Sequence, residues 1–163
     1  MSVKPIPEGF HTLTPHIVIK GAAEALEFYT KAFNAEVSLC MPGPGGTVMH
    51  AEMKIGDSHV MIADEFPGHS VSSPKTVGGT TFSLALYTED CDAAYAQAVE
   101  AGATAEMPPT DMFWGDRYSK VMDPWGHSWE ISTHKEDLSP EEIGERAAQF
   151  FASMGDGGCP PES

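Results

Sequence analysis

The sequence predicts an α+β fold in which two βαβββ modules form a curved, cleft-bearing sheet, followed by a C-terminal helix. Two observations support this. Each half shows the same order of patterns: a strand, an amphipathic helix and three further strands. A segment rich in Gly, Pro and Ser separates the halves, as a linker does. The predicted boundaries are 1–66 for the first module, 67–79 for the linker, 80–137 for the second module, 138–154 for the helix and 155–163 for a disordered tail.

Composition indicates a globular protein and excludes two classes of partner. Of the 163 residues, 41% are hydrophobic and 20% are charged. The formal net charge is -15, which disfavours nucleic acid and anionic membranes, because phosphate binding needs clustered Lys and Arg. There is no apolar run of membrane-spanning length and no signal-like core near the first residue. Three cysteines outside any motif are typical of reduced thiols in a cytoplasmic protein: Cys40, Cys91 and Cys159.

The first module begins with a strand over 13–20. A helix over 22–33 follows, because apolar residues recur at helical spacing: Ala22, Leu26, Tyr29 and Phe33. Turn residues then separate three strands, over 35–41, 47–55 and 58–63. In the strand 47–55, alternation predicts two faces, one with Met49, Ala51, Met53 and Ile55, the other with Val48, His50, Glu52 and Lys54.

The second module repeats this order. A strand over 81–88 precedes a helix over 91–101, with Asp90 or Asp92 near its N-cap and Gly102 at its C-cap. A short strand over 104–107 and a loop over 108–113 come next. The strands 117–122 and 128–133 flank a turn, 123–126, in which Pro and Gly suit the backbone.

The C-terminal helix starts at Ser139 as N-cap, with Pro and two acidic residues in its first turn. Its apolar face comprises Ile143, Ala147, Phe150, Phe151 and Met154. We expect that face to pack on the body of the protein or on a partner subunit, and we expect a homodimer.

A doubled βαβββ module ending in DPWGHSWEI resembles the vicinal oxygen chelate superfamily, which includes glyoxalase I, extradiol dioxygenases, and bleomycin- and fosfomycin-resistance proteins. The PhnB-like branch is the more similar one. The resemblance covers nearly the whole chain apart from the lead-in and the tail. It rests on TPHIVIKGAAEALEFYTKAFNAE at 14–36, MHAEMKIGDSHVMIADE at 49–65, FWGDRYSKVMDPWGHSWEISTHKED at 113–137 and SPEEI at 139–143. It implies the glyoxalase/bleomycin-resistance fold.

The resemblance also implies positions for one divalent metal ion, Zn, Ni, Fe or Mn, held by the first and last strands of each module. His16 and Glu130 match two of the four positions. The other two fall on Met61 and on Ser83, or on Phe82 if the register slips by one. Neither Met nor Ser suits such an ion, so the cofactor is one divalent metal or none. A shifted site would use His16, His50, Glu52 and Glu130, with His59 on the neighbouring strand.

Other residues are candidates for binding a ligand. Arg117 could pair with Asp116 or bind an anionic group, and the motif that contains it, with Trp114, could instead hold a loop over the core. Tyr87 and Met61 could line an aromatic cleft together with Phe113, Trp125 and Trp129. Most of these rings are expected to belong to the core, and Glu130 could be a solvated strand residue.

Three functions follow. The leading one is metal-free binding of a small molecule in the cleft, as in resistance proteins that sequester an antibiotic. The alternative is a metal-dependent lyase, isomerase or dioxygenase, in which His16 and Glu130 bind the ion and Glu52 moves a proton. The third is an enzyme that uses one Glu or His without metal. The sequence leaves open which applies, and whether the cleft lies within one chain or between two.

Overall fold

The computed structural model describes residues 3–68 and 70–153. The predicted tail and Met154 lie outside the described residues. The first module contains one helix and four strands, with a short 3-10 turn, η1 (Pro44–Gly46), between the second and third strands. These are β1 (His16–Ile19), α1 (Ala22–Phe33), β2 (Glu36–Pro42), β3 (Val48–Ile55) and β4 (Ser58–Asp64).

The second module repeats the order, and the C-terminal helix follows it as predicted. Its elements are β5 (Ser83–Tyr87), α3 (Cys91–Ala101), β6 (Thr104–Asp111), β7 (Asp116–Met122), β8 (Ser128–His134) and α4 (Pro140–Ser153). The linker contains a short helix, α2 (Pro74–Val77). None of the helices in the described part of the chain is long and apolar enough to span a bilayer.

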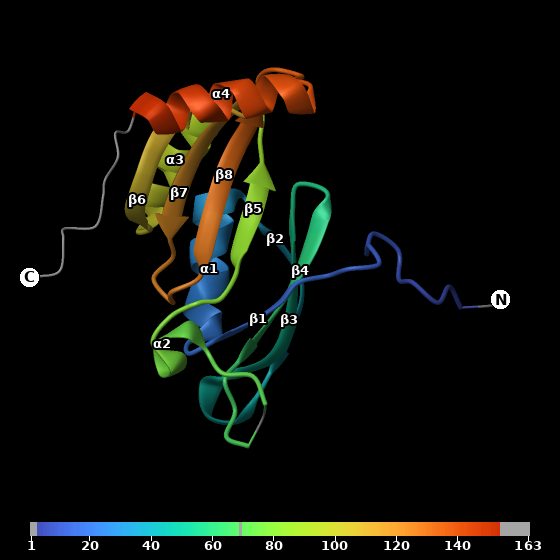
Figure 1. Cartoon of the computed structure of the whole chain (residues 1–163). Coiled ribbons are helices and arrows are strands. Elements are labelled where there is room, and N and C mark those ends of the chain that lie inside the picture. The colour runs from blue at the N-terminus through green and yellow to red at the C-terminus, as the bar shows by residue number, and fades with distance from the viewer. Residues whose placement is uncertain (1–2, 69, 154–163) are drawn as a thin grey trace, which may run out of the picture.

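Each module forms a four-stranded sheet, and the two sheets have equivalent strand orders, β1-β4-β3-β2 (sheet A) and β5-β8-β7-β6 (sheet B). The first strand of each module pairs in parallel with the last, and the other pairs are antiparallel. Figure 1 shows sheet B above sheet A, with α1 and α3 behind the strands of sheet B. The predicted α+β fold of two βαβββ modules is confirmed.

The core lies where the two helices meet the sheets. Helix α1 contacts α3, and its aromatic residues reach into the second module. The ring of Phe33 lies 4.4 Å from that of Trp129, and the ring of Phe28 lies 5.6 Å from that of Trp125. Both tryptophans are buried. These two side chains therefore join the modules, and Trp129 also borders a cavity together with Tyr87.

Two strands differ from the sequence prediction. The predicted loop 108–113 is wrong, because β6 continues to Asp111 through two prolines. An edge strand tolerates proline, since an N–H that faces solvent has no ladder partner to lose. In β3, Val48 is buried and Met49 is 52% exposed, the reverse of the predicted faces. The pairing of β2 with β3 shifts register between Met41 and Pro42, and this bulge inverts the alternation at the start of β3.

Helix α4 lies across one end of sheet B (Figure 1). Its start is a capping box, in which Ser139 and Glu142 exchange side-chain and backbone hydrogen bonds. The guanidinium of Arg146 makes two bonds to Glu136, and Phe150 packs 5.3 Å from Phe113. No residue of α4 is fully buried, so the helix stands against the sheet with its apolar face only partly covered.

Candidate functional site

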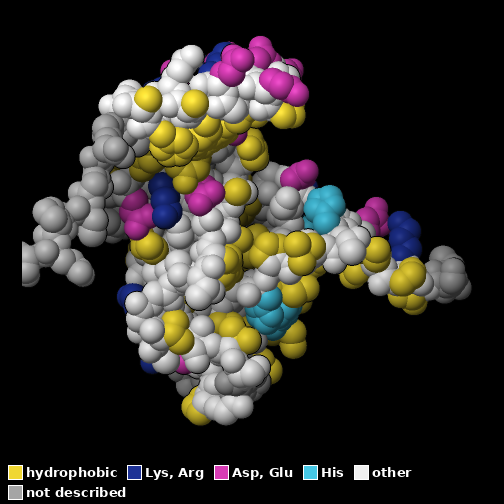
Figure 2. Space-filling view, viewed as in Figure 1, with side chains coloured by type: hydrophobic (Ala, Val, Ile, Leu, Met, Phe, Trp, Pro, Cys, Tyr) yellow, Lys and Arg dark blue, Asp and Glu magenta, His cyan; other side chains and the backbone are white. Residues whose placement is uncertain are grey.

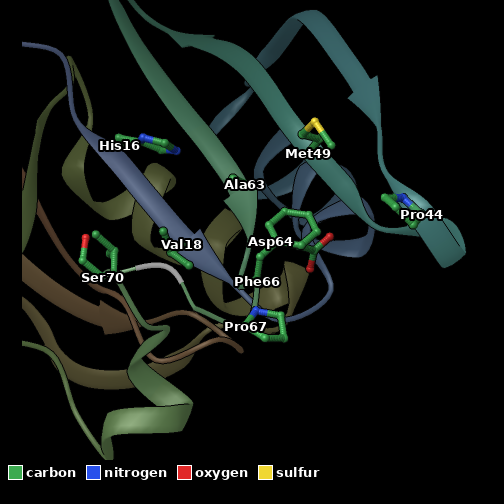
Figure 3. A pocket seen from close by; sticks show the side chains of 10 residues that line it. His16, Val18, Pro44, Met49, Ala63, Asp64, Phe66, Pro67 and Ser70 are labelled. Atoms are coloured by element: carbon green, nitrogen blue, oxygen red, sulfur yellow. The ribbon is translucent and has the colours of Figure 1, made fainter.

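The face of sheet A that turns away from α1 borders a cavity of about 620 Å³. Strand alternation places His16 and Val18 of β1 on this face, since the alternate residues Ile17 and Ile19 are buried in the core. Figure 3 shows both side chains together with Ala63 of β4. The remaining lining comes from η1, β3, the end of β4 and the segment after it: Pro44, Met49, Asp64, Phe66, Pro67, Ser70 and Val71.

The cavity is apolar apart from a few polar groups. The carboxylate of Asp64 is occupied, because it accepts the N–H groups of Gly21, Ala22 and Val48 at 2.7–3.1 Å. Burial lowers the pKa of His16, and the nearby His50 lowers it further. The imidazole of His16 is therefore neutral at pH 7, and it can offer a ligand one donor and one acceptor.

His16, His50 and Glu52 are neighbours on sheet A. The rings of His16 and His50 meet edge to face at 6.0 Å, and His50 Nε2 lies 3.4 Å from Glu52 Oε1. His59 is turned elsewhere, since its Nδ1 lies 2.8 Å from the carbonyl of Gly9. The structure thus brings three of the four residues of the predicted shifted site together.

The fourth, Glu130, lies on the open face of sheet B. Its Oε1 accepts a hydrogen bond of 2.7 Å from Ser83 Oγ. It also accepts a bond from the hydroxyl of Tyr118, whose pKa is raised first by burial and then by the charge of Glu130. The nearest lysine along the sheet, Lys120, pairs with Glu106 at 3.4 Å instead. Among the described residues, Glu130 has hydroxyl donors but no cationic partner.

The ends of the strands of sheet B carry two further clusters. Tyr87 donates a hydrogen bond of 2.9 Å to buried Asp116, which also bonds His134 at 2.7 Å. Arg117 makes an ion pair with Asp92 at the start of α3 and another with Asp111 at 3.1 Å. The sequence left open whether Arg117 pairs with Asp116, binds an anion or holds a loop; its guanidinium instead pairs with Asp92 and Asp111 and so holds β7 against α3.

The residues at the expected metal positions do not fit a resident divalent ion. His16 is paired with Met61 across β1 and β4. Across β5 and β8 the residue opposite Glu130 is Ala85, whereas Ser83 is opposite Ser128. Neither Met nor Ala supplies a donor for a borderline or hard ion. Within 3–68 and 70–153, no group of three or more His, Cys, Asp or Glu side chains is arranged to hold a metal.

Some lining residues of the cavity carry no signal in the sequence. Phe66 ends the predicted first module, and Pro67 and Val71 come from the Gly-, Pro- and Ser-rich segment that the sequence identifies only as a linker. Their position beside β4 follows from the path of the chain after Asp64, which no periodicity encodes. The cluster of Asp116 and His134 was likewise not foreseen, although both residues flank the predicted strands 117–122 and 128–133.

Curated relatives match most of the chain. An uncharacterized protein of Mycobacterium tuberculosis strain H37Rv is 39% identical over 148 residues, covering 89% of this chain and 85% of the relative. An uncharacterized protein of Arabidopsis thaliana is 31% identical over 127 residues, covering 72% of this chain and 75% of the relative.

Solved structures share the fold. The X-ray structure of an Arabidopsis thaliana gene product is 28% identical with a TM-score of 0.62, covering 76% of this chain and 98% of that one. A Bacillus cereus structure, "Putative 3-demethylubiquinone-9 3-methyltransferase, PhnB protein", has 19% identity and a TM-score of 0.59, covering 76% and 99%. At this identity the second likeness concerns the fold alone. The model of the Glyoxalase/Bleomycin resistance protein/Dioxygenase superfamily matches residues 10–131, which run from before β1 into β8. Because that match covers the first module and most of the second, the chain belongs to this superfamily.

Proposed function

We propose that the protein binds a small organic molecule in the cavity of sheet A without a resident metal ion. One observation carries the proposal: the cavity of about 620 Å³ combines an apolar lining with the neutral imidazole of His16. Ligand sites in proteins have this size and this mixture of apolar walls with few polar groups. Holding the molecule, as resistance proteins of the superfamily do, is the role that this arrangement supports best.

The chemistry of the lining defines the ligand class. Met49, Phe66 and Val71 offer apolar contacts, and His16 provides one orienting hydrogen bond. A neutral aromatic compound with a single N–H, O–H or ring nitrogen satisfies both. The metal-dependent lyase, isomerase or dioxygenase would need His16 and Glu130 on one ion, with Glu52 as the base, and the donor set does not favour it.

The first experiment measures metal and ligand binding on the same preparations. Plasma mass spectrometry of the tag-free protein and of His16→Ala and Glu130→Ala should find no stoichiometric metal. Indole, quinoline and 1-naphthol should raise the melting temperature of the metal-free protein. Met49→Trp, which fills the cavity from its rim, should abolish that rise, whereas Glu100→Trp on the exposed side of α3 should keep it.

Two results would overturn this function. Near-stoichiometric Zn, Ni, Fe or Mn that is lost in both alanine variants would restore the metal-dependent enzyme. If none of the three compounds changes the melting temperature, the cavity is not their binding site.

We also propose a cytoplasmic homodimer. Apolar side chains on β2 support the dimer, since Val37, Leu39 and Met41 are each at least 40% exposed. The free thiols of Cys40 and Cys91 support the reducing compartment. Light scattering should give twice the chain mass for the wild type and the chain mass for Leu39→Glu. A monomeric wild type would contradict the dimer.

A further inference from the structure

The open face of sheet B carries a carboxylate whose charge no described residue balances. Glu130 is half-buried and accepts bonds only from Ser83 and Tyr118, both neutral hydroxyls. Lys120 lies opposite Glu130 in the β7–β8 pairing, yet its ammonium pairs with Glu106. A partly desolvated carboxylate is stabilised by a cation, and here none of the residues that the structure describes provides one.

Aromatic rings stand directly beside this carboxylate. Tyr118, which bonds Glu130, meets Trp114 edge to face, with centroids 5.6 Å apart and planes inclined at 77°. The ring centroids of Trp114 and Phe113 are 4.9 Å apart, and those of Phe113 and Phe150 of α4 are 5.3 Å apart. Rings at right angles form two walls of a corner, and ring faces attract cations.

Helix α4 overhangs these rings. Figure 2 shows hydrophobic side chains gathered beneath the helix, and acidic and basic side chains on the sheet below them. No residue of α4 is fully buried, and Phe151 remains 61% exposed. The helix therefore leaves apolar surface uncovered on the side that faces the rings. We call the space bounded by α4, Trp114, Tyr118 and Glu130 the α4 groove.

We propose that the α4 groove binds an organic ammonium ion, with its cationic group against Glu130 and the rings of Trp114 and Tyr118, and its apolar part under α4. Charge complementarity selects this occupant. An inorganic cation would gain nothing from the apolar surface, an anion would be repelled by Glu130, and a neutral molecule could donate a hydrogen bond to Glu130 but would not balance its charge. The site is separate from the cavity of sheet A and does not depend on the function proposed there.

A pair of isosteric probes isolates the charge. Choline and 3,3-dimethylbutan-1-ol have nearly the same shape, but only choline is charged, and phenyltrimethylammonium adds an aromatic body. Titration calorimetry should detect both ammonium ions and show that the alcohol binds at least about tenfold more weakly than choline, the size of one cation–π contact. Equal affinity for choline and the alcohol, or no heat from either ammonium ion, would overturn the proposal.

Variants then locate the site. Glu130→Gln and Trp114→Leu should each weaken binding of phenyltrimethylammonium by about tenfold. Tyr118→Phe should keep the affinity or improve it, because the ring stays and the carboxylate loses a competing donor. His16→Ala, in the cavity of sheet A, should leave the affinity unchanged. Binding that survives Glu130→Gln, or that disappears in His16→Ala, would place the ammonium ion elsewhere.

Discussion

Tyr29 donates a hydrogen bond of 2.6 Å to Oδ2 of Asp123 and so ties α1 of the first module to the β7–β8 turn of the second. The same oxygen accepts Nε1–H of Trp129 at 3.0 Å. The other oxygen accepts the backbone N–H groups of Trp125 and His127, each at 2.9 Å. Burial raises the pKa of Tyr29, and the negative charge of Asp123 raises it further. Asp123 is thus a buried carboxylate with four donors, and one of them comes from the other module.

Tyr29→Phe should lower the free energy of unfolding by about 1.5–3 kcal/mol, the usual loss for a hydrogen bond to a charged group. The aromatic packing stays, so the change isolates the hydroxyl. Urea unfolding followed by tryptophan fluorescence should show a lower midpoint and an unchanged m-value.

Tyr87→Phe is the matched control, since Tyr87 also donates to a buried aspartate, Asp116, but is itself 64% exposed. Water can replace its hydroxyl, and the loss should stay below about 1 kcal/mol. Equal losses in the two variants would show that Tyr29 and Asp123 do not join the modules energetically.

Asp64→Asn should destabilise the first module by about 2 kcal/mol, the loss of one hydrogen bond between a backbone N–H and a charged carboxylate. Helix α1 starts after Gly21, which has no side-chain cap, and Asp64 at the end of β4 accepts the first two amides. Asparagine has one acceptor oxygen, and its amide N–H₂ would face an N–H donor. Chemical denaturation measures the difference.

Asp90→Asn provides the comparison. Asp90 is the side-chain N-cap of α3, where it accepts the amide of Ala93 at 2.9 Å. Asparagine caps helices as well as aspartate does, so this variant should stay close to wild type. A large loss of unfolding free energy in Asp90→Asn, or no loss in Asp64→Asn, would refute the assignment of Asp64 as the cap of α1.

The helices could be predicted from the sequence because their signals are local. The bounds and faces of some strands could not, because they depend on neighbouring strands in the sheet. The bounds of α1 and α3 agree with the predicted 22–33 and 91–101. The apolar spacing that indicates a helix and the residues that end it both lie within the helical segment, so they can be recognised without knowing the rest of the fold. The extent of β6 depends on its place at the edge of sheet B, and the bulge opposite β3 depends on β2. Neither is encoded in the segment itself.

The candidate site shows the same division. Alternation was enough to place His16 and Glu130 on the faces away from the core. The predicted register set Ser83 as the counterpart of His16, but the residue opposite Glu130 is Ala85. His16 and Ala85 each lie six residues before the first residue of the helix in their module, a spacing that the predicted register did not use.

Gly115→Ala should loosen α4. Gly115 has a φ of +96°, and a Cβ there would lie 2.6 Å from the carbonyl oxygen of Glu136. The carbonyl of Gly115 also accepts the amides of Lys135 and Glu136, which lead into the helix. Hydrogen exchange should quicken across α4. Gly45→Ala is the control: its φ is +66° with no atom within 4 Å, so it should cost only the left-handed backbone strain of about 1–2 kcal/mol and leave α4 protected.

His134 should make the stability of this end of sheet B depend on pH. Its pKa is raised above the usual value, first by the hydrogen bond to Asp116 at 2.7 Å and then by that to Asp137 at 3.0 Å. A raised folded-state pKa means that the protonated form is stabilised by folding. Its contribution is complete below the unfolded pKa of about 6.5 and is lost as pH rises through the folded pKa.

His134→Gln should therefore lose more stability relative to wild type at about pH 6 than at about pH 9, as measured by urea unfolding at both values. Asp137→Asn keeps Asp116 and removes the second partner, so it should show the same sign with a smaller difference. The difference in unfolding free energy between wild type and His134→Gln could instead stay constant or widen toward high pH. That result would mean that the proton on His134 does not strengthen the contact between the end of β8 and the segment leading to α4.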